Sequence, residues 1–152
     1  MAYPDNSRNR FNQPRQTQFK PQLPEKIEAE PLPKDYVEKA EDVMRELIEN
    51  GVRITTSKIR NLLSMISDIY NVENMRDDPD LKPESKAAVT MLRIRVAYEA
   101  GRDQQVVGTF VKKAKLLQYI KDIGSDREKL INFAHYMEAL VAYHRFYGGR
   151  EG

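Results

Sequence analysis

Residues 54–66, ITTSKIRNLLSMI, bring cations and hydroxyl groups together at the start of a predicted amphipathic helix. The hydroxyl residues at this start, of the type that caps helices, are Thr55, Thr56 and Ser57. Lys58 and Arg60 follow in the first turns, where the positive end of the helix dipole disfavours a cation by about 0.3–1 kcal/mol. Either the two cations extend into solvent, or they help the N–H groups and hydroxyls of the helix start to bind an anion such as phosphate.

The types and spacing of the residues give little support for an enzyme. The two histidines, His135 and His144, are nine residues apart, which does not place them on adjacent helical turns as metal ligands, and we interpret both as structural. The segment DDPD, residues 77–80, lacks the glycine and the closing glutamate of a calcium loop and is interpreted as a solvated connection. We find no phosphate-binding glycine-rich loop and no activated nucleophile. The prediction is a protein without catalysis, cofactor, metal or small-molecule substrate.

Composition limits the remaining classes. A chain of 152 residues with 40% hydrophobic content is expected to form one folded domain. The chain has no cysteine, which fits a reducing compartment and predicts a cytoplasmic protein. No apolar run reaches the roughly 18 residues that span a membrane, and no signal peptide is recognisable. Because 25 Lys and Arg nearly balance 23 Asp and Glu, any case for nucleic-acid binding depends on where the cations lie.

The elements that must position these side chains are predicted to be helices. Residues 1–33 hold six of the eight prolines and few large apolar residues, so we expect a flexible tail there and a helical domain at residues 34–152. The tail is either a solvated spacer or a basic arm that follows phosphates. Apolar spacing predicts an all-α, compact bundle of five helices, at about residues 34–50, 54–70, 83–100, 104–123 and 125–147.

Several details of this bundle follow from local signals. The expected core of the third helix is Ala87, Ala88, Met91, Leu92 and Tyr98, with arginines on neighbouring faces. Gly108 is expected to mark a close contact between helices. Ser125 and Glu128 have the spacing of a capping box at the start of the last helix. The aromatic residues of that helix could offer stacking surfaces for bases, but at helical spacing they are more typical of a core.

Three motifs carry a resemblance to a known family. They are TTSKIRNLLS (residues 55–64), LRIRVAYEAGR (residues 92–102) and YMEALVAYHRFYGG (residues 136–149). In this order, over about residues 34–150, the chain resembles the small subunit of type III-A CRISPR–Cas effector complexes, the Csm complexes. The tail lies outside the resemblance.

The resemblance implies a small all-helical protein without catalytic activity in an RNA-guided antiviral ribonucleoprotein. Several copies would line up along the inner face of the complex, beside backbone subunits that hold the CRISPR RNA. They would contact the guide–target RNA heteroduplex through its sugar-phosphate backbone, independently of sequence. The implied partners are CRISPR RNA, target RNA, the backbone and large subunits, and neighbouring copies of the chain.

With this resemblance, the anion-binding interpretation of the helix start becomes the favoured one. The candidate RNA-binding residues are Lys58 and Arg60, then Arg93, which matches the family's LR, and Arg102, with Lys113 and Arg95 behind them. Two other interpretations stay open. One is a helical adaptor that binds only protein, and the other is a small nucleic-acid-binding regulator outside any CRISPR complex.

Overall fold

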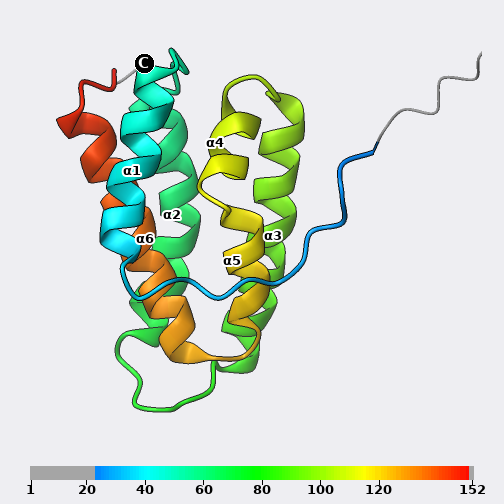
Figure 1. The fold of residues 1–152 in the computed structure, drawn as a ribbon. Helices are drawn as coiled ribbons and strands as arrows, with labels where there is room; N and C mark the ends of the chain where they lie inside the picture. Colours follow the sequence, from blue (N-terminus) through cyan, green and yellow to red (C-terminus); the bar gives the residue numbers. More distant parts are fainter. Residues whose placement is uncertain (1–22, 151–152) are drawn as a thin grey trace, which may run out of the picture.

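The structure, a computed structural model, describes residues 23–150, and this part of the chain has an all-α fold, as predicted (Figure 1). Its helices are α1 (Tyr36–Glu49), α2 (Thr56–Glu73), α3 (Pro83–Arg102), α4 (Val107–Lys113), α5 (Leu116–Ile123) and α6 (Arg127–Phe146). The only β-type pairing among residues 23–150 is one isolated bridge between Asp80 and Asp126. Within that range, every helix is too short or too polar to cross a membrane.

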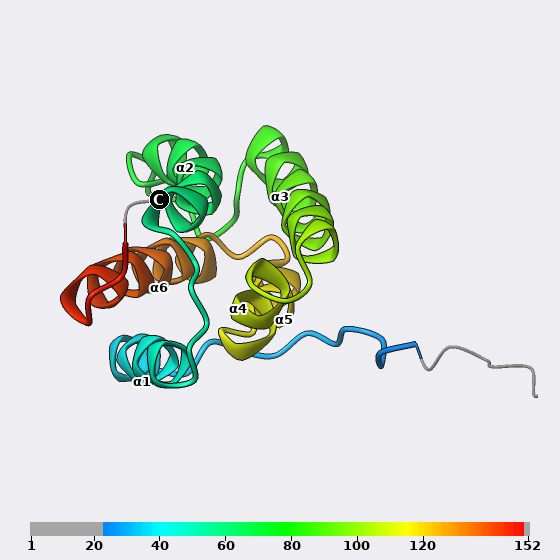
Figure 2. The ribbon, with the colours of Figure 1, turned by 90° about the horizontal axis from the view of Figure 1, so that it is seen from above.

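Helix α6 forms the centre of the bundle. It packs against α1, α2 and α5, whereas α3 packs against α2, α4 and α5. Figure 2 shows α6 between α1 and α2, with α3, α4 and α5 grouped to one side. Because α6 has neighbours on most sides, aromatic residues such as Phe133 and Tyr136 are buried in the core. The interpretation as core is thus confirmed for these two residues, whereas Tyr143 and Tyr147 are only partly buried and Phe146 is 77% exposed.

The starts of α2 and α6 are both capped by side chains. Thr55 caps α2, since its Oγ1 accepts the backbone N–H of Lys58 at 3.3 Å. The capping box predicted at Ser125 and Glu128 is wrong by one residue. Asp126 is the cap of α6, because its carboxylate accepts the N–H of Lys129 at 3.1 Å. A carboxylate one residue further on supplies the same kind of acceptor, so periodicity alone did not separate the two positions.

The single helix predicted at residues 104–123 is in fact two helices. Lys115 has a φ of 53°, in the left-handed region, and this ends α4 and begins α5. A non-glycine residue in this conformation costs about 1 kcal/mol. The freed carbonyl of Ala114 instead accepts the Tyr136 hydroxyl from α6 at 2.9 Å, which satisfies it inside the core. The prediction for Gly108 is confirmed, because a Cβ there would lie 2.9 Å from the Ala100 carbonyl oxygen.

The predicted core of α3 is largely wrong. Its buried residues are Ser85, Val89, Leu92 and Val96, of which only Leu92 was expected. Met91 and Tyr98 are 61% and 58% exposed. Helix α3 carries apolar residues on more than one side, and its position between α2 and the α4–α5 pair decides which of them are covered.

Residues 27–33 run across α5 as an extended strap, whereas residues 1–22 of the predicted tail lie outside the described residues (Figure 1). The Glu30 N–H donates to the Gln118 carbonyl at 3.2 Å, and the Lys121 ammonium donates to the Ile27 carbonyl at 2.9 Å. The Lys115 ammonium also pairs with Glu30. The boundary at residue 33 stays a prediction, but the strap is attached to the helical unit.

Candidate nucleic-acid interface

Two of the predicted cations, Lys58 and Arg102, meet where the start of α2 lies beside the end of the antiparallel α3 (Figure 1). They line one shallow pocket of about 380 Å³. The Lys58 ammonium lies 2.9 Å from an Asp103 carboxylate oxygen and is half exposed. Arg102 lies 3.6 Å from Glu99, and its side chain is 65% exposed. The fold thus brings together two cations that are 44 positions apart in the sequence.

The pocket around Lys58 and Arg102 is balanced in charge. Its carboxylates are Glu99 and Asp103, and the hydrogen bond from Lys58 is the main reason that the pKa of Asp103 lies below its ordinary value. Asp103 therefore stays ionised at neutral pH. Exposed ion pairs of this kind contribute little to stability, so a phosphate can replace a carboxylate as the partner of either cation at small cost.

Arg95 extends the same side of the molecule. It lines a broad groove between α2 and α3, of about 710 Å³, together with Met65, Asp68 and other residues. It precedes Arg102 by seven residues, or about two helical turns, so both lie on one side of α3. We call the surface that carries Lys58, Arg95 and Arg102 the α2–α3 face.

The other three candidates lie elsewhere. Arg60 follows Lys58 by two residues, and Arg93 precedes Arg95 by two, so each is turned by roughly 200° around its helix from its neighbour. Both are exposed and have no acidic partner among residues 23–150. Lys113, at the end of α4, is paired with Glu46 of α1. The six predicted RNA-binding residues thus form one group of three and three isolated positions.

The hydroxyl residues at the start of α2 have partners inside the chain. Thr55 is occupied as the cap, and Thr56 is buried. The Thr56 N–H donates to the Arg150 carbonyl at 2.7 Å, and its hydroxyl also donates to that carbonyl at 3.1 Å. The segment after α6 therefore covers part of this helix start. An anion site at Thr55, Thr56 and Ser57 stays a prediction, and it depends chiefly on the nearby cationic side chains.

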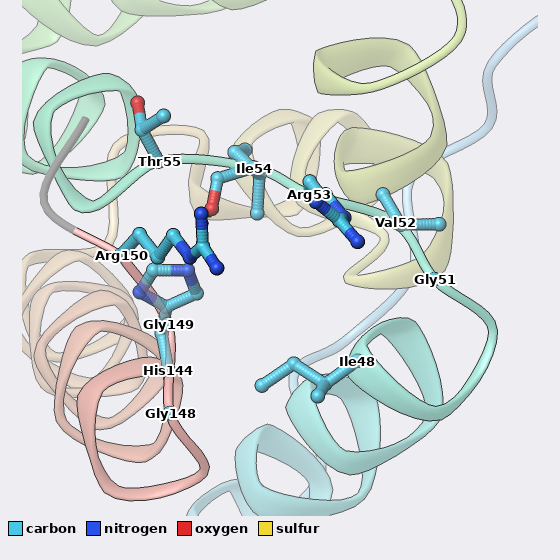
Figure 3. Close-up of a pocket in the computed structure, with 10 residues that line it drawn as sticks. All are labelled: Ile48, Gly51, Val52, Arg53, Ile54, Thr55, His144, Gly148, Gly149 and Arg150. Atoms are coloured by element: carbon cyan, nitrogen blue, oxygen red, sulfur yellow. Dashed lines mark hydrogen bonds between the residues drawn. The ribbon is translucent and has the colours of Figure 1, made fainter.

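His144 holds two loops together beneath this helix start (Figure 3). Its side chain is buried, with Nε2 2.7 Å from the Ile54 carbonyl and Nδ1 3.2 Å from the Thr56 hydroxyl. Because a carbonyl only accepts, Nε2 carries the hydrogen. Burial is the main cause that lowers the pKa of His144, and the Arg145 charge adds to it, whereas the hydrogen bond with Ile54 opposes it. The structural interpretation of His144 is confirmed.

We expect the free energy of unfolding to fall as the pH drops below about 6.5, the ordinary pKa of histidine. The unfolded chain then binds a proton that buried His144 resists, and the Arg145 charge adds to the resistance. This part of the stability is complete above the unfolded pKa and is lost towards the lowered folded pKa. Thermal unfolding at about pH 7.5 and pH 5.5 measures the effect.

His144→Gln tests the assignment, because glutamine keeps an N–H donor for the Ile54 carbonyl but does not titrate. Its loss of stability between the two pH values should be smaller than that of the wild type. His135→Gln, at the histidine that lies near Tyr70, is the control and should retain the wild-type pH dependence. Equal pH dependence of His144→Gln and wild type would contradict the prediction.

Within residues 23–150, no three His, Cys, Asp or Glu side chains gather in a way that could hold a metal ion. The acidic segment at residues 77–80 is engaged within the chain. Asp78 accepts the N–H of Asp80 at 2.9 Å, and the Arg76 guanidinium lies 3.5 Å from the Asp78 carboxylate. This geometry is that of a connection tied to the end of α2, as its sequence suggested.

Sequence comparisons agree with the resemblance carried by the three motifs. A family model described as Csm2 Type III-A matches residues 30–150. Two relatives named CRISPR system Cms protein Csm2 are each 40% identical to this chain. The one from Mycobacterium tuberculosis (strain CDC 1551 / Oshkosh) aligns over 114 residues, 74% of this chain and 90% of the relative. The one from Streptococcus thermophilus aligns over 121 residues, 77% and 94%. A relative of the same name from Enterococcus italicus is 35% identical over 96 residues, 62% and 68%.

Proposed function

The chain belongs to the Csm2 type III-A family and is thereby a structural subunit of a type III-A CRISPR complex, and on this premise we propose that it binds the guide–target RNA heteroduplex through the phosphate backbone. Binding would be independent of RNA sequence, because phosphate contacts position a protein without reading bases. The subunit would itself be non-catalytic and would act in the cytoplasm without a cofactor.

The observation that carries the proposal is the α2–α3 face, where Lys58, Arg95 and Arg102 lie together and are exposed. Lysine and arginine are the usual partners of phosphates, and arginine can contact two oxygens at once. The carboxylates on this face keep the affinity of a single copy moderate. In a complex with several copies, such contacts act together on one RNA and their effects multiply.

The α2–α3 face also favours contact with protein. Met91, Ile94 and Tyr98 of α3 are more than half exposed, and they line the groove beside Arg95. Exposed apolar side chains gathered on one surface are typical of interaction sites. We propose that backbone or large subunits, or a neighbouring copy, contact this groove while the cations contact CRISPR RNA or target RNA. A protein-only adaptor would use the groove without the cations.

Purification of the tagged full-length chain from its native host tests this function. We expect larger subunits and an RNA of uniform length to purify with it. The RNA should be lost when salt is raised, because phosphate contacts release counterions on binding. Larger subunits that purify without RNA at any salt concentration would favour the adaptor. A chain bound to a specific DNA site, with no other subunits, would favour the regulator.

A further inference from the structure

A second pocket lies on the other side of the α2 start, between the α1–α2 connection and the segment after α6 (Figure 3). Its volume is about 310 Å³, and none of its lining residues is acidic. They are Ile48, Gly51, Val52, Arg53, Ile54, Thr55, His144, Gly148, Gly149 and Arg150. Arg53 lies on one wall and Arg150 on the other, 97 positions apart in the sequence.

Neither arginine of this pocket has an acidic partner among residues 23–150, and both are exposed. This distinguishes them from Lys58, Arg102 and Lys113, each of which is paired with a carboxylate. Two guanidinium groups repel each other in a pocket whose described lining residues include no carboxylate. An anion between them would remove the repulsion and form charge-assisted hydrogen bonds with both.

The backbone that carries each arginine is held in place. The Val52 N–H donates to the Leu47 carbonyl at 2.9 Å, and Ile54 is fixed by His144. On the other wall, the Gly149 N–H donates to the His144 carbonyl at 2.7 Å. Gly149 also lies against the His144 ring so closely that any Cβ there would overlap it. His144 therefore positions both walls before a ligand arrives, which lowers the entropic cost of binding.

We propose that Arg53 and Arg150 bind a phosphate group of the RNA backbone in this pocket. The choice of RNA as the source of the phosphate rests on the proposed function. It is supported by position, since Thr55 lines this pocket while Ser57 and Lys58 line the pocket shared with Arg102. One RNA strand that crosses the start of α2 would reach both pockets. Arginine suits this role because its planar fork matches two phosphate oxygens.

The double variant Arg53→Gln and Arg150→Gln of the full-length chain tests the pocket. RNA affinity at low salt should fall by about 10-fold, and the slope of log K against log[salt] should flatten by about 1.4 for two lost contacts with single-stranded RNA. The matched control is Lys86→Gln with Lys112→Gln, which removes the same charge from two exposed lysines of α3 and α4. The control should retain more of the affinity and the slope.

A second measurement separates RNA from free phosphate. Inorganic phosphate, added at an ionic strength matched with chloride, should shift the NMR signals of the arginine Nε–H groups of Arg53 and Arg150, which the single Gln variants assign. RNA should shift the same signals and compete with inorganic phosphate. Unchanged signals with both probes would overturn the proposal.

The variants of the α2–α3 face separate failure of this pocket from failure of the proposed function. If Lys58→Gln with Arg102→Gln weakens RNA binding while the pocket variant binds like wild type, the pocket proposal is overturned and the proposed function stands. If wild type itself does not bind RNA but phosphate shifts the two signals, the pocket binds free phosphate and the RNA assignment is overturned.

Discussion

Replacing Glu73 with alanine is expected to lower the free energy of unfolding by about 3 kcal/mol, the size expected when one partner of a buried ion pair is removed. The Glu73 carboxylate is fully buried at the end of α2. It accepts from the Arg76 guanidinium at 2.7 Å and from the Lys82 N–H at 3.1 Å, and the Ser85 hydroxyl is a further partner. Its loss would leave the Lys82 N–H without this acceptor and would remove the closest acidic partner of Arg76, which then keeps only Asp78 and the Asp80 carbonyl. Because Arg76 is partly exposed, we expect the lower end of the usual range.

Chemical denaturation of Glu73→Ala and wild type at neutral pH measures this loss, and Glu138→Ala is the control. Glu138 is exposed on α6, so its removal should cost little. Equal stability of the two variants would show that the buried carboxylate does not tie α2 to α3.

Glu73 is also expected to make the free energy of unfolding depend on pH in the acidic range. Burial raises the pKa of Glu73, but hydrogen bonds from Ser85, Arg76 and Lys82 together with the Arg76 charge outweigh it, so the pKa is lowered. The stability that Glu73 contributes is therefore present above the ordinary glutamate pKa and is lost as the pH falls through the folded value. The difference between wild type and Glu73→Ala should shrink in acid.

Replacing Lys58 and Arg102 together with glutamine is expected to weaken RNA binding by about 10-fold at low salt and to flatten the salt slope by about 1.4 for single-stranded RNA. Both side chains are exposed and flank the core, so the fold should be retained. Glutamine is preferred to glutamate here because a new acid beside Asp103 would repel it and disturb the α2–α3 contact. Affinity should fall equally for two unrelated RNAs, since backbone contacts do not specify sequence.

A second pair of variants shows which surface meets the RNA. Arg60→Gln with Arg93→Gln removes the two candidates that point away from the α2–α3 face and have no acidic partner among residues 23–150. We expect a smaller loss of affinity than for Lys58 and Arg102. A larger loss, or an unchanged salt slope for the Lys58 and Arg102 variant, would mean that the RNA lies against a different face.

The sequence by itself determined the features that depend on neighbours along the chain. Thr55 marked the cap of α2, and the predicted helix ends at residues 50 and 100 lie within about two residues of the ends of α1 and α3, because helix-ending signals act over a single turn. The close approach at Gly108 was likewise readable from one residue type inside a helical pattern. The three motifs were sufficient to indicate the family. No local signal in the sequence indicated that Glu73 is buried, because residue type alone does not distinguish a buried glutamate from an exposed one.

Tertiary structure alone decided which residues meet. The break at Lys115 is sustained by Tyr136 from another helix, so no periodicity within residues 104–123 could reveal it. Helix α3 has apolar residues on more than one side, and the positions of the neighbouring helices determine which side is buried. The pairing of Lys58 with Arg102, and of Arg53 with Arg150, joins positions far apart in the chain. Helix propensity and capping are local, whereas a binding surface is assembled by packing between helices, and it therefore appears only when the bundle is complete.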